Sequence, residues 1–416
     1  MNTAVTPVLF EQEQHTIEKY DIDDDARKIV YRLQRAGFKA YVVGGGVRDL
    51  LLGKTPKDFD ISTDASPGQI KSLFRNCRII GRRFKLAHIF FARGKIIEVS
   101  TFRDSIEAPD SDDNLAGPIK NDNLYGTEET DAIRRDLTIN GLFLDVSTMT
   151  VIDYVNGMHD LHQGIVRIIG DPTTRFTEDP VRMLRAVRHA ARSGFRIDET
   201  CWKAIIDNAA LLTQSSQVRV FDELRKDVSS GCFLSILSLL GDTGLLEFIL
   251  PELLENNGRL LSAESDFSLC LERIDDMVQN GGEMSATTVL AIIALFISGD
   301  SIWLRDLVED LARSKGLAER LDDCFTSLTV PRKERERILM LIQKWIKIRN
   351  TDPSVFRAGS YKRLTLLPDL LLLLEITQFT KEDGTRLQIL KSLLDSNQSV
   401  HNHHKKPKGS RRIKRM

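Results

Sequence analysis

The sequence is poor in cysteine, and its cysteines have none of the spacings that hold a zinc ion or a disulfide framework. Its 416 residues contain five cysteines, and no two of them form a C-x-x-C pair. Small secreted domains and zinc modules depend on closely spaced cysteines, so the pattern argues against both classes. We expect the chain to work in a reducing, cytoplasmic environment.

Long hydrophobic runs are also missing. The longest, TVLAIIALFI at residues 288–297, is about half as long as the ~20 residues that a membrane-spanning helix needs. The N-terminal segment lacks the charged and apolar regions of a secretory signal. These absences predict a soluble intracellular protein with no transmembrane segment.

Two familiar nucleotide-binding motifs are incomplete around residue 50. The stretch GGGVRDLLLGKT ends like a P-loop, but a P-loop would need glycine at position 48, where the chain has arginine. The dinucleotide fingerprint G-x-G-x-x-G, begun at Gly44, would need glycine at position 49, where the chain has aspartate. Both interpretations fail on spacing, so the glycine cluster needs another explanation.

The net charge of −1 is unevenly distributed. Residues 401–416 carry seven lysines and arginines and no acidic residue, which leaves residues 1–400 with a net charge of −8. A basic tail on an acidic body predicts a polyanionic partner, either nucleic acid or an anionic lipid surface. A tail that only keeps the protein soluble is the alternative.

The chain divides into an α/β head and a helical remainder. Its length predicts several domains. DDARKIVYRLQRAG is typical of a helix ended by Gly37, and KAYVVGG, DFDIST, HIFFARGKIIEVSTF and NGLFLDVSTMTVIDYV are typical of strands. The polar segment 103–126 predicts a mobile loop, and amphipathic helices follow from about residue 160. The expected domains are a flexible N-terminal lead-in (1–22), the α/β head (23–157), a helical neck (158–230), a helical body (231–400) and the basic tail (401–416).

Two glycines and two aspartates in the head are the first candidates for chemistry. Gly44 and Gly45 follow a β-rich run, where bare backbone N–H groups can approach phosphate oxygens, and Arg48 would add a positive charge. Asp58 and Asp60 are two residues apart on a predicted strand, so both carboxylates should face the same side. Such a pair favours Mg²⁺, with substrate phosphates completing its ligands. For the glycines alone, a tight turn without a ligand is the alternative.

The stretch GGGVRDLLLGKTPKDFDI resembles the template-independent nucleotidyltransferases of the polymerase β superfamily. It is most similar to the class that contains CCA-adding enzymes and bacterial poly(A) polymerases. The resemblance covers most of the head and neck and is faint in the rest of the chain. It implies a polymerase β-like mixed sheet with helices, followed by an all-α neck and body.

The resemblance implies roles for four more residues of the head. Glu98, within IIEVSTFR, would be a third carboxylate beside the aspartate pair. Within RRDLTIN, Arg135 would touch the triphosphate, Asp136 would belong to the catalytic acidic set, and Asn140 would help to hold the nucleotide sugar. Without the resemblance, Arg-Arg-Asp before an apolar run could simply begin a helix.

The segment EDPVRMLRAVRHAAR resembles the E-D-x-x-R helix of the same class. The resemblance implies that Asp179 and Arg182 lie near the base of the incoming nucleotide, with Arg185 close by. Taken alone, Asp179 before Pro180 is also typical of a helix N-cap. His189 replaces the aromatic residue usually found in this helix, and the sequence assigns it no role.

The implied reaction is in-line attack by an RNA 3′-hydroxyl on the α-phosphate of a nucleoside triphosphate. Two Mg²⁺ ions held by Asp58, Asp60 and a third carboxylate would assist it. FRNCRIIGRRFKLAHI and NDNLYGTEETDAIRRDLTIN resemble the poly(A) polymerase branch. That branch implies ATP as substrate and RNA 3′ ends, mRNA among them, held by the neck and the basic tail.

Two other functions stay open at this point. CCA-adding tRNA nucleotidyltransferases share all the catalytic motifs, and a catalytically inactive RNA-binding module would belong to a different functional class. The RNA-degradation machinery is a further candidate partner. Intact Asp58, Asp60 and Asp136 argue against the inactive module.

One cluster of metal-ligating residue types lies outside these motifs. His159, Asp160 and His162 fall within YVNGMHDLHQGIVRIIG, which is typical of a strand, a turn and a second strand. Neighbouring side chains on a strand point to opposite faces, so we do not expect a metal site there.

Overall fold

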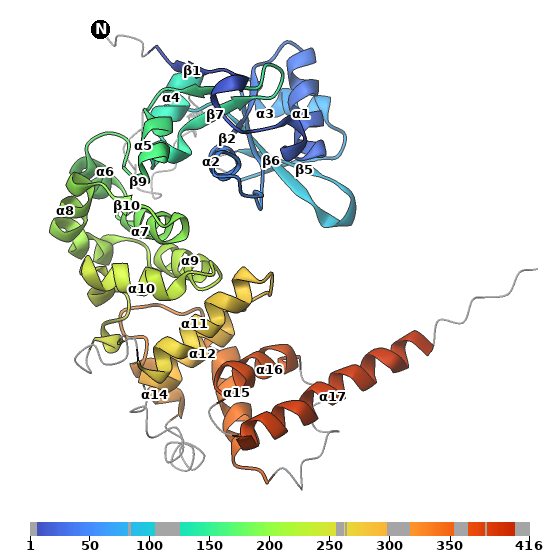
Figure 1. Cartoon of the computed structure of the whole chain (residues 1–416), viewed down its shortest axis with the longest axis vertical. Coiled ribbons are helices and arrows are strands. Elements are labelled where there is room, and N and C mark those ends of the chain that lie inside the picture. The colour runs from blue at the N-terminus through green and yellow to red at the C-terminus, as the bar shows by residue number, and fades with distance from the viewer. Residues whose placement is uncertain are drawn as a thin grey trace, which may run out of the picture. The chain divides into compact units, whose positions relative to one another are not determined.

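The chain forms two compact units, Met1–Asn208 and Ala209–Met416, in this computed structural model (Figure 1). The structure describes residues 6–81, 85–104, 125–254, 262, 264–297, 317–352, 365–378 and 381–403. The division at residue 208 differs from the expected domains, because the first part of the predicted neck belongs to the same unit as the head. Most of the predicted mobile loop and residues 404–416 of the basic tail lie outside the described residues.

A mixed sheet of eight strands forms the centre of the first unit. The strand order is β1-β8-β7-β2-β3-β6-β5-β4. Only β3 and β6 pair in parallel; the other neighbours are antiparallel. The strands are β1 (Val8–Phe10), β2 (Ala40–Val43), β3 (Asp60–Thr63), β4 (Cys77–Ile80), β5 (Leu86–Phe90), β6 (Ile96–Thr101), β7 (Leu142–Asp145) and β8 (Thr150–Asp153). The α/β head with a mixed sheet is therefore confirmed.

Helix α1 (Asp24–Arg35) packs against β2 and contributes its apolar face to the core of this unit. Asp23 caps the helix by accepting hydrogen bonds from the backbone N–H groups of Asp25 and Ala26. The helix ends just before Gly37, whose φ of +88° suits glycine. A second short helix, α3 (Pro67–Leu73), packs against β4 and β5. The predicted helix and its glycine stop are confirmed.

Within the predicted lead-in, residues 6–22 are described, and they are ordered parts of the first unit. Val8–Phe10 forms β1 and pairs with β8 at one edge of the sheet. Ile17 and Ile22 are fully buried in the core beneath it. The polar composition of the segment concealed these two anchoring residues, since neither belongs to a periodic apolar pattern.

Residues 157–163 form a helix, α5 (Gly157–Gln163), in place of the predicted turn between two strands. Asp153, at the end of β8, caps this helix by accepting a hydrogen bond from the Gly157 N–H at 3.0 Å. Asp160 is buried and accepts hydrogen bonds from Thr138 Oγ1 at 2.7 Å and Arg167 Nε at 3.0 Å. Asp160 therefore has a structural role, connecting α5 to Thr138 and Arg167.

Helices α6 (Pro172–Glu178), α7 (Val181–Ser193) and α8 (Glu199–Asn208) complete the first unit. Two short parallel strands, β9 (Ile165–Val166) and β10 (Arg196–Ile197), lie beside α7. Val181, Leu184 and Val187, spaced three residues apart along one face of α7, are buried. Its polar stripe carries the arginines that contribute to the site described below.

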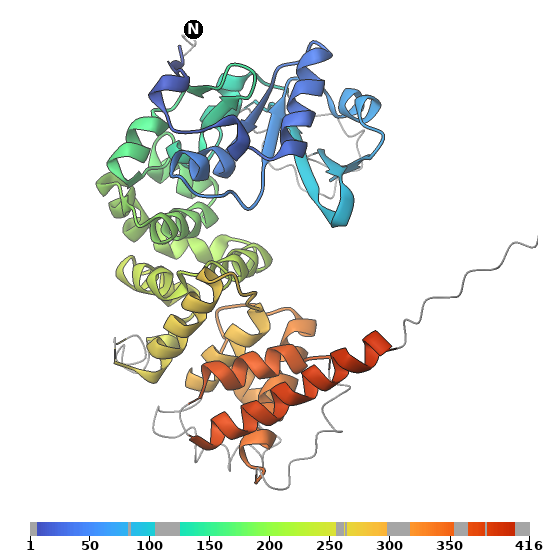
Figure 2. The same cartoon turned by 45° about the vertical axis from the view of Figure 1, so that its right-hand side comes forward.

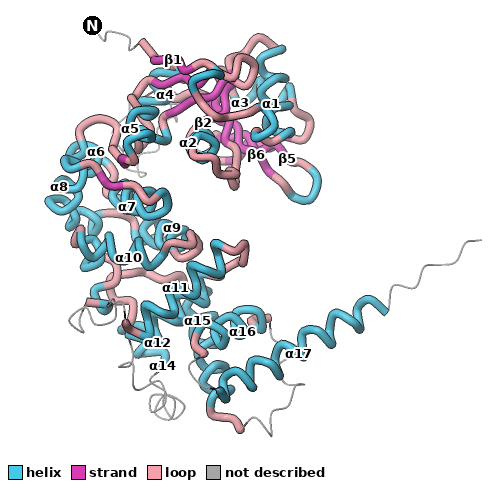
Figure 3. Tube along the Cα trace, viewed as in Figure 1, coloured by secondary structure: helices cyan, strands magenta, loops and turns pink. Residues whose placement is uncertain are grey.

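The second unit is helical throughout its described residues (Figures 2 and 3). Its α-helices are α9 (Gln217–Asp227), α10 (Phe233–Asp242), α11 (Asp266–Gln279), α12 (Ala286–Ile297), α14 (Leu317–Asp323), α15 (Arg332–Arg349), α16 (Leu367–Ile376) and α17 (Lys381–His403). The longest apolar run of the sequence forms α12, which is buried against α15 and α16. Among the described helices, none is both long and apolar enough to cross a bilayer.

Candidate active site

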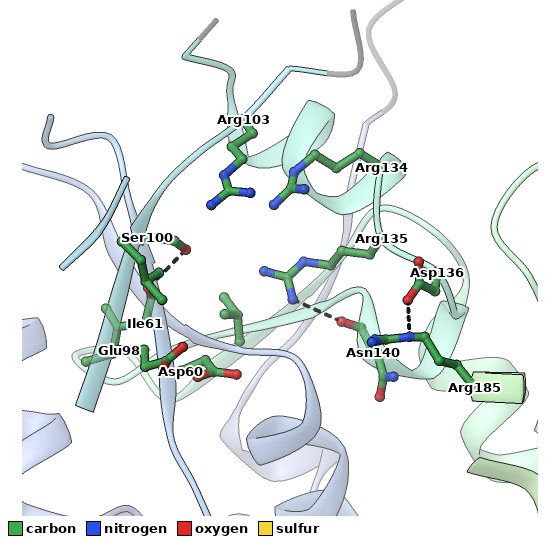
Figure 4. Close-up of a pocket in the computed structure, with 12 residues that line it drawn as sticks. Asp60, Ile61, Glu98, Ser100, Arg103, Arg134, Arg135, Asp136, Asn140 and Arg185 are labelled. Carbon is green, nitrogen blue, oxygen red and sulfur yellow. Dashed lines mark hydrogen bonds and ion pairs between the residues drawn. The ribbon is translucent and has the colours of Figure 1, made fainter. Parts of the chain in front are cut away.

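A cavity of about 290 Å³ opens where β3 and β6 meet the end of α4 (Glu128–Ile133), the 3-10 turn η4 (Thr138–Asn140) and α7 (Figure 4). Polar and charged side chains dominate its lining. The lining residues are Val43, Asp60, Ile61, Leu86, Glu98, Ser100, Arg103, Arg134, Arg135, Asp136, Asn140 and Arg185. Seven of the lining residues are charged. Six of them belong to the motifs that the sequence singled out, although these motifs lie far apart in the chain, and the seventh is Arg103.

One wall of the cavity is acidic. Asp60 begins β3 and is paired in register with Glu98 on the parallel strand β6, so both side chains project from one face. Removal from water and the charge of Glu98 raise the pKa of Asp60 to about 6; Asp58 adds to the effect, and Arg135 opposes it. Two carboxylates held together in this way favour a cation between them.

Asp58 is placed differently from the expectation. The strand begins only at Asp60, and Asp58 lies exposed in the loop that precedes it. It does not line the cavity, but its charge is near enough to raise the pKa of Asp60. Asp60 is therefore the first residue of the strand, and Asp58 belongs to the loop before it, so the two aspartates do not share a strand.

His88 is a neighbour of the acidic wall that sequence reasoning assigned no role. It is paired with Glu98 across β5 and β6, and its Nε2 lies 3.2 Å from Glu98 Oε1. The contact fixes one oxygen of Glu98 from the side opposite Asp60.

The acidic wall has the donor chemistry of a divalent-cation site. Mg²⁺ prefers carboxylate oxygens and commonly completes its shell with water and substrate phosphate. Asp60 and Glu98 supply such oxygens, and Asp58 lies two residues before Asp60 in the exposed loop. Within the described residues, no group of three His, Cys, Asp or Glu side chains is placed to hold a metal ion by itself. An open site that needs substrate oxygens fits this arrangement.

The opposite wall is basic, and a buried aspartate holds two of its arginines. Asp131 is fully buried and pairs with Arg134 Nε and Arg135 Nη2, both at 2.9 Å. Burial acts to raise the pKa of Asp131, but Arg135 and Arg134 together hold it below its usual value. Arg103 lines the same wall, where burial and Arg134 lower its pKa. Three guanidinium groups near one another suit a polyanion such as a triphosphate.

Arg135 is the most closely held residue of the basic wall. Besides Asp131, its guanidinium donates to Ser62 Oγ at 3.3 Å and to the Asn140 carbonyl oxygen at 3.4 Å. Its guanidinium carbon also lies 5.3 Å from the centre of the Phe143 ring. These partners aim the side chain at the cavity from a fixed direction.

The two candidate glycines make room for arginines. Gly44 has φ of +71°, and a Cβ there would come within 3.1 Å of Arg135 Nη1. The Gly44 N–H donates to the Leu142 carbonyl at 3.3 Å, so it is part of the sheet. A Cβ at Gly45 would lie 3.4 Å from Arg48 Nη2. The glycines therefore allow two guanidinium groups to approach the backbone.

Arg48 lies behind the cavity, where it is buried, and does not line it. Its Nε and Nη2 donate to Asp49 Oδ1 at 2.9 and 2.7 Å. Its Nη1 donates to Asn140 Oδ1 at 2.6 Å and to His189 Nδ1 at 3.1 Å. The sequence predicted that Arg48 would face phosphate. In the structure its guanidinium instead holds the side chains of Asp49, Asn140 and His189.

Asp136 lines the cavity on the side away from Asp60 and Glu98, as Figure 4 shows. Its two oxygens pair with Arg182 Nε at 3.2 Å and Arg185 Nε at 2.5 Å. This geometry joins Asp136 to the arginines of α7 and sets it apart from the acidic wall.

The residues Asp179 and Arg182 lie at the start of α7. Asp179 is the C-cap residue that follows α6, and Pro180 is the N-cap of α7, so Asp179 is not the N-cap that the sequence suggested. Its carbonyl oxygen accepts a hydrogen bond from the Arg182 N–H at 3.1 Å. The Arg182 side chain is buried between Asp136 and Glu178. Of these motif arginines, only Arg185 reaches the cavity itself.

Several residues of the site were missed in the sequence. Asp131 could have been found, because it precedes Arg134 and Arg135 by three and four residues, the spacing of ion pairs along a helix. Ser62, Ser100 and His88 gave no such signal, because their contacts depend on strand pairing.

Comparisons with known proteins agree with this geometry. Residues 40–167 match the family model described as the poly A polymerase head domain, and residues 194–256 match the model described as the probable RNA and SrmB-binding site of polymerase A. The protein named poly(A) polymerase I of Salmonella typhi is 40% identical over 343 residues, which are 77% of this chain and 71% of that protein.

Proteins named CCA-adding enzymes are also similar over a shorter part. That of Leuconostoc mesenteroides is 38% identical over 202 residues, 49% of each chain. Among solved structures, the Bacillus stearothermophilus CCA-adding enzyme in complex with CTP has a TM-score of 0.64 at 22% identity, and the match covers 94% of this chain and 90% of that one. The structural likeness concerns the fold.

Proposed function

This chain belongs to the poly(A) polymerase family, and from that premise we propose that it transfers AMP from ATP to RNA 3′ ends and releases pyrophosphate. The observation that supports this proposal most strongly is the pairing of an acidic and a basic wall in one cavity. Asp60 and Glu98 form the first wall, and Arg134 and Arg135 form part of the second. Nucleotidyl transfer needs both, because a polyphosphate must be bound beside cation-holding carboxylates.

In this proposal, Asp58, Asp60 and Glu98 hold Mg²⁺. When bound there, Mg²⁺ supplies charge stabilisation to the attacking and leaving oxygens. The acidic pair can take this role because the register of β3 and β6 sets the two residues side by side, and His88 contacts one oxygen of Glu98. No side chain of the chain is required as a nucleophile, since the attacking group belongs to the RNA.

The basic wall would bind the triphosphate. Arg135 is directed at the cavity by Asp131, Ser62 and the Asn140 carbonyl, so it can meet phosphate oxygens without losing its orientation. Arg134 and Arg103 would neutralise the charge that develops on the leaving pyrophosphate. The Asn140 side chain would meet the sugar.

The beginning of α7 would meet the base. Arg185 reaches the cavity, and Asp136 fixes it together with Arg182. Asp179 lies at the same helix start, and its carboxylate would complete the polar groups near the base. In this arrangement Asp136 positions arginines of the nucleotide site.

CCA addition is the second candidate function. Its support is the similarity of about half of the chain to proteins named CCA-adding enzymes. The match to proteins named poly(A) polymerase I covers more of the chain and has higher identity, which favours AMP addition.

RNA is the polymer substrate in this proposal. Solved relatives include a tRNA nucleotidyltransferase complexed with a primer tRNA and an incoming ATP analog. The free cysteines fit a reducing compartment, and we place the enzyme in the cytoplasm. Binding of RNA through the basic tail and association with the RNA-degradation machinery stay predictions from the sequence.

Incubation of the protein with an RNA oligonucleotide, MgCl₂ and each nucleoside triphosphate separately tests the proposal. We expect long products with ATP alone. Addition of only C, C and A to a tRNA that lacks this end would support CCA addition instead. If the protein extends no RNA with any nucleotide but still binds RNA in a gel-shift assay, the result would support the inactive RNA-binding module instead.

Two variants connect this activity to the cavity. Asp60→Asn and Glu98→Gln should abolish extension, because each removes a carboxylate of the acidic wall while keeping its size. Asp207→Asn, at an exposed position on α8, is the matched control and should extend RNA like the wild type. Extension near the wild-type rate by Asp60→Asn would contradict the assignment.

A further inference from the structure

Three polar side chains from separate elements meet at the edge of the cavity, which Asn140 lines and Arg48 and His189 do not. Arg48 comes from α2 (Gly45–Leu51), Asn140 from η4 and His189 from α7. Arg48 Nη1 lies 2.6 Å from Asn140 Oδ1 and 3.1 Å from His189 Nδ1, and Asn140 Nδ2 lies 3.4 Å from His189 Nε2. All three belong to the first unit.

The chemistry of these groups fixes which atoms donate hydrogen bonds. A guanidinium group can only donate, so Asn140 must present its carbonyl Oδ1 to Arg48, and His189 must present an unprotonated Nδ1. A neutral imidazole then carries its proton on Nε2. Burial and the charges of Arg48 and three arginines of α7 keep the pKa of His189 well below its usual value, which maintains the neutral form.

Two donors therefore face each other at Asn140 Nδ2 and His189 Nε2. Neither can accept the hydrogen of the other, and in the described part of the chain neither nitrogen has an acceptor. Half-buried donors are normally satisfied by an acceptor. The geometry thus indicates an oxygen atom that both N–H groups can reach.

The position of this donor pair indicates which oxygen it takes. The Asn140 carbonyl accepts a hydrogen bond from Arg135, on the basic wall, and Figure 4 shows Asn140 beside Arg135 and Arg185. In a nucleotide the sugar is bonded directly to the α-phosphate, so the group next to a phosphate-binding arginine is the ribose. A neutral pair of donors suits a hydroxyl, whereas the charged phosphates are matched by the guanidinium groups.

We propose that His189 Nε2 and Asn140 Nδ2 together donate hydrogen bonds to one ribose hydroxyl of the incoming nucleotide, so that His189 determines selectivity for ribonucleotides. The proposal rests on the nucleotide-binding function of the cavity. Arg48 is the positioning residue, because it orients both partners through one nitrogen atom.

Single-nucleotide addition to an RNA primer with ATP, 2′-deoxy-ATP and 3′-deoxy-ATP tests this proposal. The wild type should discriminate against one deoxy analogue, and the analogue identifies the hydroxyl. His189→Leu removes both imidazole nitrogens and should lower kcat/KM for ATP about five- to tenfold, the value of one hydrogen bond. Its kcat/KM for the disfavoured analogue should stay the same, so the discrimination is lost.

His189→Gln serves as the conservative variant, because its amide can accept from Arg48 and donate to the hydroxyl. It should keep part of the discrimination, and thermal unfolding should show whether each variant is folded. An equal fall in kcat/KM for all three nucleotides in His189→Leu would overturn the proposal and leave His189 a structural role. A wild type that accepts both analogues as well as ATP would also overturn it.

The experiment also distinguishes a failure of this proposal from a failure of the proposed polymerase activity. In that case the wild type adds no nucleotide, and equilibrium binding of ATP and the two analogues replaces the kinetic assay. A preference for ATP that disappears in His189→Leu would support the donor pair even then. The absence of any preference would overturn it.

Discussion

Asp60 and Glu98 lie side by side because they occupy paired positions on the parallel strands β3 and β6. Asp60 stands at the exposed start of β3, but the protein around its carboxyl partly replaces water, and this together with the charge of Glu98 raises the pKa of Asp60 to about 6. The folded protein, in the absence of a cation, is under electrostatic strain at this wall.

We therefore predict that removing the negative charge of Asp60 stabilises the folded protein, and that the gain depends on pH. The folded-state pKa of Asp60 exceeds the unfolded value, so its contribution to stability is lost as pH rises from about 4 through about 6. Asp60→Asn should thus stabilise the metal-free protein by about 1 kcal/mol near pH 7.5, after discounting for solvent screening, and by nothing near pH 4. Urea unfolding in EDTA at both pH values measures this, with Asp207→Asn as control. Equal effects at both pH values would contradict the prediction.

Gly44 and Gly53 offer a matched pair of substitutions. Both have positive φ, of +71° and +67°, but a Cβ at Gly44 would meet Arg135 Nη1 at 3.1 Å, whereas nothing lies within 4 Å at Gly53. Gly53→Ala should cost about 1 kcal/mol of stability through its positive φ, and Gly44→Ala about 2–3 kcal/mol, because its ψ of −135° at positive φ belongs to a region that only glycine readily adopts. Only Gly44→Ala should also raise the KM for ATP several-fold, because it displaces Arg135.

Steady-state kinetics with ATP on an RNA primer, alongside thermal unfolding, separate the two effects. A similar rise of KM in Gly53→Ala would mean that backbone strain alone disturbs the site. An unchanged KM in Gly44→Ala would show that Arg135 can move without consequence.

The resemblance of the motifs implied the mixed sheet and the acidic wall, whereas the alternation of the sequence alone placed Asp58 on the strand that begins only at Asp60. Glu98 was expected beside Asp60, and the strand register places it there. The role of Arg48 could not be predicted, since its partners Asn140 and His189 are 92 and 141 residues away in the chain. Patterns of neighbouring residues do not indicate contacts between residues so far apart in the chain.

The helix α5 was missed for a different physical reason. Seven residues are too few to show a 3.6-residue period, and the neighbouring β-rich runs favoured a turn. The helix is held by tertiary contacts instead. Asp153 caps it, and a Cβ at Gly157 would come within 2.2 Å of the Thr138 carbonyl oxygen, so only glycine allows this close approach.

Asp131 should be essential to the basic wall although it does not line the cavity. Asp131→Asn leaves Arg134 and Arg135 without their buried counter-charge, so we expect a loss of about 3 kcal/mol of stability near pH 7 and a higher KM for ATP. Arg135 and Arg134 lower the pKa of Asp131 against the effect of burial. Its stabilising contribution is therefore present above about pH 4 and lost as pH falls through the lowered pKa.

Urea unfolding of the wild type and Asp131→Asn near pH 7 and near pH 3 checks this sign. The difference between the two proteins should shrink at the lower pH. A difference that grows on acidification would show that the aspartate is not held in its charged form by the arginines.

Arg48 should affect ATP use through Asn140 and His189 without touching the nucleotide. Arg48→Lys keeps the charge but cannot reach Asp49, Asn140 and His189 at once, because an ammonium group lacks the planar fork of guanidinium. We expect about 2 kcal/mol lower stability, since polar groups in a buried network lose their partner, and reduced discrimination between ATP and its deoxy analogues. Arg192→Lys is the control, because Arg192 also pairs with Asp49, through Oδ2 at 3.2 Å, but its side chain is 44% exposed. Loss of stability with unchanged discrimination in Arg48→Lys would limit Arg48 to a structural role, whereas loss of both would link the buried arginine to sugar selection.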